Sequence, residues 1–116
     1  MSLTFDEICI DAGDIHALAA WWANLLGWPH ELTDDGDVAL RAPVGSGPDW
    51  LFVAVPDDKV VKNRIHFDFR PDDQQAEVDR VVGLGARHVD IGQGEQTWVV
   101  LADPEGNEFC ILAADD

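Results

Sequence analysis

The sequence predicts an α+β protein made of two consecutive β-α-β-β-β modules. Twice along the chain, an alternating strand pattern is followed by an acidic cap and a helical stripe of apolar residues. Twice the helix stops at glycine, and three extended segments separated by turn-forming residues come next. Neither module could bury its helix stripe and sheet face alone. The 116 residues are therefore expected to form one domain, with module one over about 3–56 and module two over about 63–114.

The first module opens with residues 5–11, which alternate as a strand with one apolar face. Asp14 is suited to cap the following helix, because its carboxylate can accept hydrogen bonds from the unpaired amides of the first turn. Apolar side chains between residues 15 and 26 form one helical stripe, and Gly27 is suited to end it. Extended segments are predicted at about 28–32, 38–42 and 50–55.

The second module repeats this order. Residues 65–70 alternate as a strand, Asp72 and Asp73 supply a cap, and the helical stripe that follows ends at the "GLG" of 83–85. The segment "DPEGN" at 103–107 predicts a hairpin turn, with proline preset for the second position of the turn and glycine free to take a positive φ. The helical stripe consists of Val78, Val81 and Val82, and extended segments are predicted at about 87–91, 97–102 and 108–112.

Composition excludes some partners. Seven basic residues against 23 acidic residues give a net charge of −16. Binding to nucleic acid or to an anionic membrane requires lysine and arginine to neutralise phosphates, so neither partner is expected. The N-terminal segment has no basic region followed by an apolar run, and no stretch reaches the length that spans a bilayer. A cytoplasmic protein with reduced Cys9 and Cys110 is therefore expected.

The segment "KNRIHFDFRPDD" at 62–73 carries candidate site residues. His66, Asp68 and Arg70 lie on one side of a strand whose other side is apolar. That side is either ordinary solvent-facing surface or the lining of a cavity. A histidine beside a carboxylate is suited to proton transfer near neutral pH, but the pair can also serve only to satisfy each other's hydrogen bonds.

Four motifs together resemble the vicinal oxygen chelate superfamily, and more closely its glyoxalase-like proteins, which are grouped with bleomycin resistance proteins and dioxygenases. They are the paired β-α-β-β-β order, "AAWWANLLGW", "KNRIHFDF" and "DPEGNEFCIL". The resemblance implies that the two modules form a cup-shaped half-barrel with the helices outside, which encloses a small molecule. It also implies a homodimer. In catalytic members one divalent metal is held in the cup, with ligands from the first and last strands of each module.

Carried over by position, the resemblance implies Glu7, His66 and Cys110 as metal ligands. His66 matches the family's first-strand histidine, and Glu7 stands at the equivalent place in module one. Cys110 replaces the usual glutamate of the last strand, and the corresponding residue of module one is expected to be Val53, which cannot bind a metal. Such a set suits zinc, nickel, manganese or iron. A cysteine flanked by Phe109 and Ile111 is equally explained as a small buried hydrophobe, in which case no metal is bound.

Two tryptophans are candidate ligand contacts. Trp50 and Trp98 open strands at what look like matching places of the two modules, where they would either clamp a planar or cationic ligand together with Asp68 or simply close the end of the barrel. Three functions therefore remain open. They are a small-molecule-binding protein with a degenerate metal site, a metal-dependent lyase or dioxygenase, and a metal-independent protein that sequesters an antibiotic or another small molecule.

Overall fold

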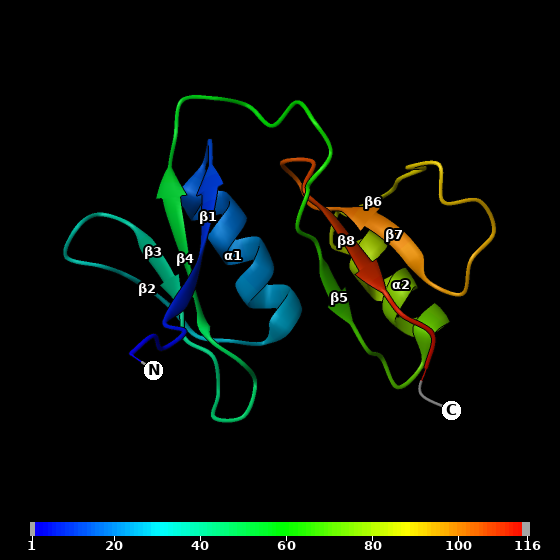
Figure 1. The fold of residues 1–116 in the computed structure, drawn as a ribbon, viewed down its shortest axis with the longest axis horizontal. Coiled ribbons are helices and arrows are strands. Elements are labelled where there is room, and N and C mark those ends of the chain that lie inside the picture. Colours follow the sequence, from blue (N-terminus) through cyan, green and yellow to red (C-terminus); the bar gives the residue numbers. More distant parts are fainter. Residues whose placement is uncertain (1, 115–116) are drawn as a thin grey trace. The chain divides into compact units, whose positions relative to one another are not determined.

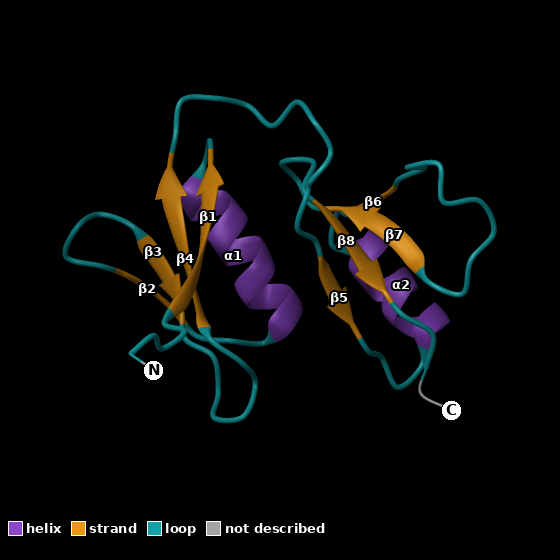
Figure 2. Cartoon of the chain, in the orientation of Figure 1, coloured by secondary structure: helices purple, strands orange, loops and turns teal. Residues whose placement is uncertain are grey.

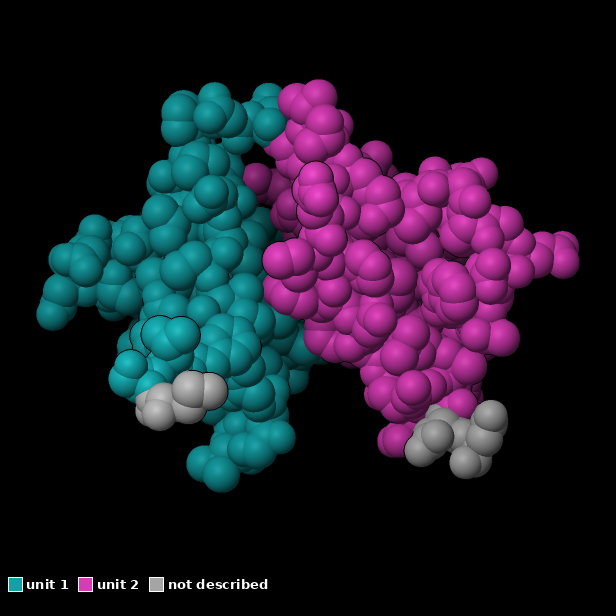
Figure 3. Space-filling view, viewed as in Figure 1, with its two compact units in different colours: residues 1–58 teal, residues 59–116 magenta. Residues whose placement is uncertain are grey.

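The computed structural model of the protein describes residues 2–114, and it confirms the predicted fold class. The described residues form two compact units, 1–58 and 59–116, each with the order β-α-β-β-β (Figures 1 to 3). Among the described residues, no helix is both long and apolar enough to cross a membrane.

Unit 1 is a four-stranded sheet with one helix packed against all four of its strands. The strand order is β1-β4-β3-β2, with β1 parallel to β4 and the other neighbours antiparallel. The parallel pair follows from the helix, because the chain must cross over before β4 can run beside β1 in the same direction. The elements are β1 (Glu7–Ala12), α1 (Ile15–Leu26), β2 (His30–Leu32), β3 (Val38–Leu40) and β4 (Asp49–Ala54).

Local signals fix the ends of α1 as predicted. The Asp14 carboxylate accepts a hydrogen bond from the Ala17 backbone N–H at 3.0 Å, so the first turn has its cap. Gly27 ends the helix with φ 71°, a left-handed conformation that residues with a Cβ rarely take. The buried face of α1 then packs on the sheet, where Leu40 and Phe52 are fully buried.

Unit 2 repeats this architecture with shorter strands. The order is β5-β8-β7-β6, with β5 parallel to β8. Asp73 caps α2 by accepting from the Ala76 N–H at 3.1 Å, as predicted. The "DPEGN" turn is confirmed between β7 and β8, and the buried Asp103 carboxylate organises it by accepting hydrogen bonds from three N–H donors. The elements are β5 (Phe67–Phe69), α2 (Gln74–Gly83), β6 (Arg87–His88), β7 (Val99–Ala102) and β8 (Glu108–Ile111).

Three details of unit 2 differ from the sequence-based expectation. β5 pairs with β8 only over its three residues, and Ile65 before it is 81 % exposed rather than packed against the helix. β6 is shorter than expected, and positive-φ glycines at 92 and 94 carry the chain away from the sheet. Val78 and Val81 are buried on α2, whereas Val82 is partly exposed.

The two sheets share a register that repeats every 59 residues. The helix caps Asp14 and Asp73 are 59 residues apart. Cys9 pairs with Leu51 in unit 1, and Asp68 pairs with Cys110 in unit 2, each 59 positions later. The counterpart of Cys110 in unit 1 is therefore Leu51. The expectation that placed Val53 there was wrong by two residues, because sequence alone did not give the pairing of the strands.

Candidate functional site

The candidate site begins at the edge strand β5. Asp68 lies in the middle of β5 and stands directly opposite Cys110 on β8, so the two side chains leave the same face of the sheet. His66 directly precedes β5 and shares this face, because alternate strand residues point the same way. The Phe69 ring contacts the Phe109 ring in an edge-to-face arrangement, with centroids 6.1 Å apart. That contact anchors the opposite face of the strand.

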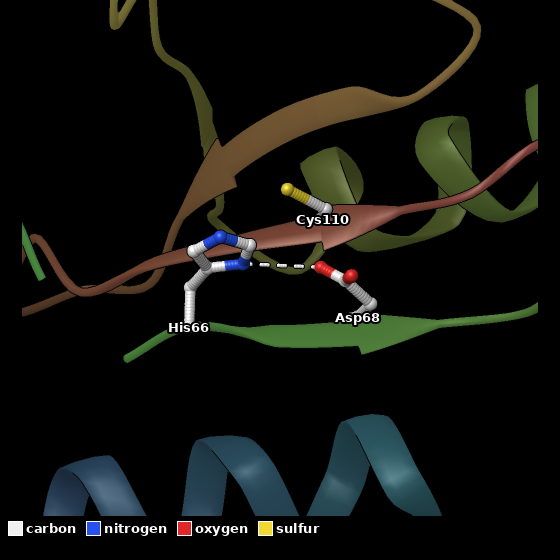
Figure 4. A group of neighbouring side chains, drawn as sticks. All are labelled: His66, Asp68 and Cys110. Atoms are coloured by element: carbon white, nitrogen blue, oxygen red, sulfur yellow. Dashed lines mark hydrogen bonds and ion pairs between the residues drawn. The ribbon is translucent and has the colours of Figure 1, made fainter. Parts of the chain in front are cut away.

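His66 and Asp68 form a hydrogen-bonded pair (Figure 4). His66 Nδ1 lies 3.1 Å from Asp68 Oδ1. An ionised carboxylate can only accept, so we assign the proton to Nδ1. When the ring is neutral, this tautomer leaves Nε2 without a proton and able to bind a metal or accept a proton from a ligand. Both side chains are partly exposed, so both can reach a ligand.

The Cys110 thiol points toward this pair (Figure 4). Cys110 is only 4 % exposed. Burial raises the pKa of its thiol to about 11, and the charge of Asp68 together with a hydrogen bond to that carboxylate adds to the effect, while Lys62 opposes it. Without a metal, Cys110 is therefore a neutral thiol at physiological pH that donates to Asp68, and not a nucleophile.

These three residues form part of the lining of a concavity of ≈ 270 Å³ within unit 2. Its other walls are apolar side chains and one amide, from Ile91, Gln93, Trp98 and Leu112. The Gln93 side chain is itself held in place, because its Oε1 accepts from the Ile91 N–H at 2.8 Å. Trp98 is 37 % exposed and so presents part of its indole to the space. An apolar wall with a few convergent polar groups is the usual composition of a small-molecule site.

The donor atoms of His66, Asp68 and Cys110 lie within 4.8 Å of one another. Ligand atoms around a zinc ion are about 3.3–3.8 Å apart, so side-chain shifts of about 1 Å would bring these three into range. Deprotonating a thiol of pKa about 11 at pH 7 costs about 5 kcal/mol. Zinc binding at structural sites releases about 10–16 kcal/mol, which is enough to offset that cost. The residues therefore fit a divalent ion that accepts nitrogen, oxygen and sulfur ligands.

The structure brings together His66 and Cys110 from the expected metal set, and it adds Asp68, which the sequence suggested only as a ligand contact. Glu7 lies on β1 of unit 1, where its carboxylate accepts a hydrogen bond from the Cys9 thiol at 3.4 Å. Asp68 could have been recognised as a third donor from the strand register, because it faces Cys110 directly.

Trp50 and Trp98 are not equivalent. Trp50 is 4 % exposed and packs edge-to-face against Trp22 and Trp28 in the core of unit 1. By the shared register its counterpart in unit 2 is the buried Phe109, since Trp50 pairs with Ile8 and Phe109 pairs with Phe67. Trp98 lines the concavity, as proposed from the sequence, whereas Trp50 has a structural role within its unit.

Comparisons with known proteins agree with this fold. The chain matches FosX, a fosfomycin resistance protein from Listeria monocytogenes, with a TM-score of 0.72, 16% identity, and coverage of 99% of this chain and 94% of that one. It matches a bleomycin resistance determinant encoded on the transposon Tn5 with a TM-score of 0.63, 16% identity, and coverage of 98% and 100%. A glyoxalase/bleomycin resistance protein/dioxygenase family enzyme from Burkholderia phytofirmans PsJN gives a TM-score of 0.68, 20% identity, and coverage of 91% and 94%.

At these identities the structural matches establish the fold alone. A search of curated proteins finds no significant match. The sequence model of the glyoxalase-like domain, however, matches residues 7–112, which is nearly the whole chain and includes every residue of the cluster. The chain is a member of the glyoxalase-like domain family.

Proposed function

We propose that this protein binds a small organic molecule in the concavity of unit 2 and that its metal site is degenerate. The observation that carries the proposal is the convergence of the partly exposed indole of Trp98 with the His66–Asp68 pair in one space of ≈ 270 Å³. This volume is at the lower end of the range for ligand sites, about 300–1,000 Å³, so the ligand is small or only partly enclosed.

The lining suggests how such a ligand would be held. The indole of Trp98 provides a face for an aromatic ring or an organic cation, and such contacts contribute about 0.5–2 kcal/mol. The unprotonated Nε2 of His66 can accept a hydrogen bond, and the Asp68 carboxylate can accept from an amine. Ile91 and Leu112 exclude water from the apolar part of the ligand.

The test is a screen of small aromatic and cationic compounds against metal-free protein, followed by tryptophan fluorescence and ligand-observed NMR. Replacement of Trp98 by alanine and of His66 by alanine should each weaken binding about tenfold, corresponding to the loss of one contact of about 1.4 kcal/mol. Trp21→Phe in unit 1 is the control and should leave the affinity unchanged. Binding of equal strength in the Trp98 and His66 variants would refute the proposed site.

A second function is favoured by the clustered donor atoms of His66, Asp68 and Cys110. In this alternative the three residues hold one divalent metal in a lyase or dioxygenase. A thiol and an imidazole beside one carboxylate favour zinc, nickel or iron over manganese, which prefers oxygen ligands. When bound, such an ion acts as a Lewis acid toward substrate oxygens. The chain's own contribution is to orient the imidazole through Asp68 and to surround the site with the apolar walls of the concavity.

Metal analysis of untagged protein discriminates the two functions. The enzyme alternative requires stoichiometric metal that is lost in His66→Ala and retained in His88→Ala, since His88 is an exposed residue of β6 outside the cluster. Metal-free wild-type protein that cannot be reloaded would exclude it. We further propose that the protein acts as a homodimer in the cytoplasm. Light scattering of the purified protein tests the homodimer, and fractionation of the source cells tests the location.

A further inference from the structure

Glu108, at the start of β8, joins the segment 59–63 to the sheet of unit 2. Its carboxylate accepts a hydrogen bond from the Asn63 backbone N–H at 2.9 Å and pairs with Lys59 Nζ at 3.0 Å. The Asn63 side-chain amide donates to the Glu108 carbonyl oxygen at 3.3 Å. The Glu108 side chain is only 11 % exposed, so these bonds are well shielded from water.

This attachment is close to the candidate site on both strands. Glu108 precedes Cys110 by two residues, and Asn63 precedes His66 by three. The regular pairing of β5 with β8 begins only at Phe67, which faces Phe109. The chain is thus held at Asn63 beside Glu108 and again at Phe67 beside the next residue of β8.

The three residues between these two attachments loop outward. Arg64 and Ile65 are exposed, and His66 lies where the chain returns to the sheet. Extra residues on one strand of a pair bend the chain and re-aim a side chain, which is a common device next to functional sites. The orientation of His66 therefore depends on both ends of this short loop, and Glu108 holds the end that the β ladder does not.

Unit 1 offers an internal comparison. Asp49 begins β4 at the position equivalent to Glu108, 59 residues earlier, and it too accepts a backbone hydrogen bond and pairs with a cation. Its partners are the Ala42 N–H and Arg41, which follow β3, and not the segment that precedes β1. Only in unit 2, among the described residues, does this acid hold the segment that leads into the clustered side chains.

We propose that Glu108 is a positioning residue that sets the orientation of the His66 imidazole toward Asp68 and Cys110. Its importance for ligand binding rests on the proposed function, whereas its effect on the imidazole does not. Burial alone would raise the pKa of Glu108, but the hydrogen bonds from Asn63 and Lys59 outweigh it and lower the pKa. The carboxylate therefore stays ionised, and the attachment stays intact, at neutral pH.

The test uses full-length protein with ¹⁵N-labelled histidine, observed by long-range ¹H–¹⁵N NMR at about pH 8.5, where an ordinary imidazole is neutral. In the wild type, His66 should show the Nδ1–H tautomer that its bond to Asp68 requires. Glu108→Ala should convert this signal to a mixture with the Nε2–H tautomer. Glu108→Gln retains one acceptor oxygen for the Asn63 N–H and should restore most of the wild-type signal. Asp49→Ala is the matched control and should leave His66 unchanged.

An unchanged His66 signal in folded Glu108→Ala, or an equal change in Asp49→Ala, would overturn the positioning role. If Glu108→Ala does not fold, Lys59→Met removes one arm of the attachment and should shift the same signal in the same direction. No shift there would also overturn the proposal. If the wild type binds neither the screened compounds nor Co²⁺, the proposed function fails, and the imidazole spectra still decide the role of Glu108. If Co²⁺ binds, Glu108→Ala should weaken it about 10- to 100-fold, as loss of an outer support does at metal sites.

Discussion

Cys110 is expected to be a slow thiol whose reactivity is set by Asp68. The thiol is buried beside a carboxylate that both accepts its proton and repels its thiolate, so its pKa lies at about 11. Replacing Asp68 by asparagine removes the negative charge. The pKa of Cys110 should therefore fall, although burial, the largest cause of the shift, should keep it above that of an ordinary thiol.

The size of the effect follows from the thiolate fraction. At pH 8 a thiol of pKa about 11 is ionised to about one part in a thousand, against about a quarter for an ordinary cysteine of pKa about 8.5. A more basic thiolate is the better nucleophile, with a Brønsted coefficient of about 0.4–0.5, which recovers roughly tenfold. The net expectation is alkylation about 20-fold slower than for an unperturbed thiol, and burial slows it further.

The assay is alkylation of EDTA-treated protein by iodoacetamide between pH 7 and 10, resolved by peptide mass spectrometry. The Cys110 rate should rise about tenfold per pH unit across this range, and Asp68→Asn should raise the rate at pH 8 about threefold per unit of pKa lost. Glu7→Gln is the control. It should speed the exposed Cys9, whose pKa is raised chiefly by its hydrogen bond to Glu7, and leave Cys110 unchanged. A wild-type Cys110 as fast as Cys9 at pH 8, or an Asp68→Asn variant that slows Cys110, would refute this reasoning.

Three further predictions concern stability and are checked by urea unfolding. Asp103→Ala leaves buried N–H donors of the hairpin turn without an acceptor and should destabilise the protein by about 2–4 kcal/mol, whereas exposed Asp34→Ala should change stability by less than about 0.5. Asp14→Ala and Asp73→Ala each remove a helix cap and should cost about 1 kcal/mol, and equality with wild type would exclude capping. Because the folded-state pKa of Glu108 is lowered, its contribution is present above the unfolded value of about 4.5 and is lost as the pH falls through the folded value, so Glu108→Gln should show a shallower acid decline than wild type.

The parts of the fold that local chemistry determines were predictable from the sequence. Asp14 and Asp73 cap helices because a carboxylate before an apolar stripe satisfies free amides, and Gly27 ends one because it tolerates a positive φ. The extent of β5 was not predictable. Ile65 continues the alternation of the strand, but a strand ends where its partner ends, and the outward loop before Phe67 depends on a bond to a residue more than 40 positions away.

The site was only partly predictable for the same reason. His66 and Cys110 were found through motifs, and they lie together. The inclusion of Asp68, the counterpart Leu51, and the core position of Trp50 all require the strand register, which hydrophobic alternation does not supply. Trp50 and Trp98 look equivalent in the sequence, yet the register matches Trp50 to Phe109.

The comparison of the two units separates residues that serve folding from residues that do not. Asp14 and Asp73 perform the same capping role, and the equivalent positions Trp50 and Phe109 both hold buried aromatic rings. At the positions of the cluster the units differ, and unit 1 has no counterpart of the thiol because Leu51 stands in its place.

Capping and core burial are required in any β-α-β-β-β module, so the same side-chain roles recur at these equivalent positions. His66 and Asp68 are partly exposed and contribute little apolar burial, so folding does not explain their presence. Their replacement should therefore leave the unfolding free energy within about 0.5 kcal/mol of wild type, as for other surface positions, while it removes ligand binding. A protein in which His66→Ala unfolded as readily as a cap variant would place this pair among the structural residues instead.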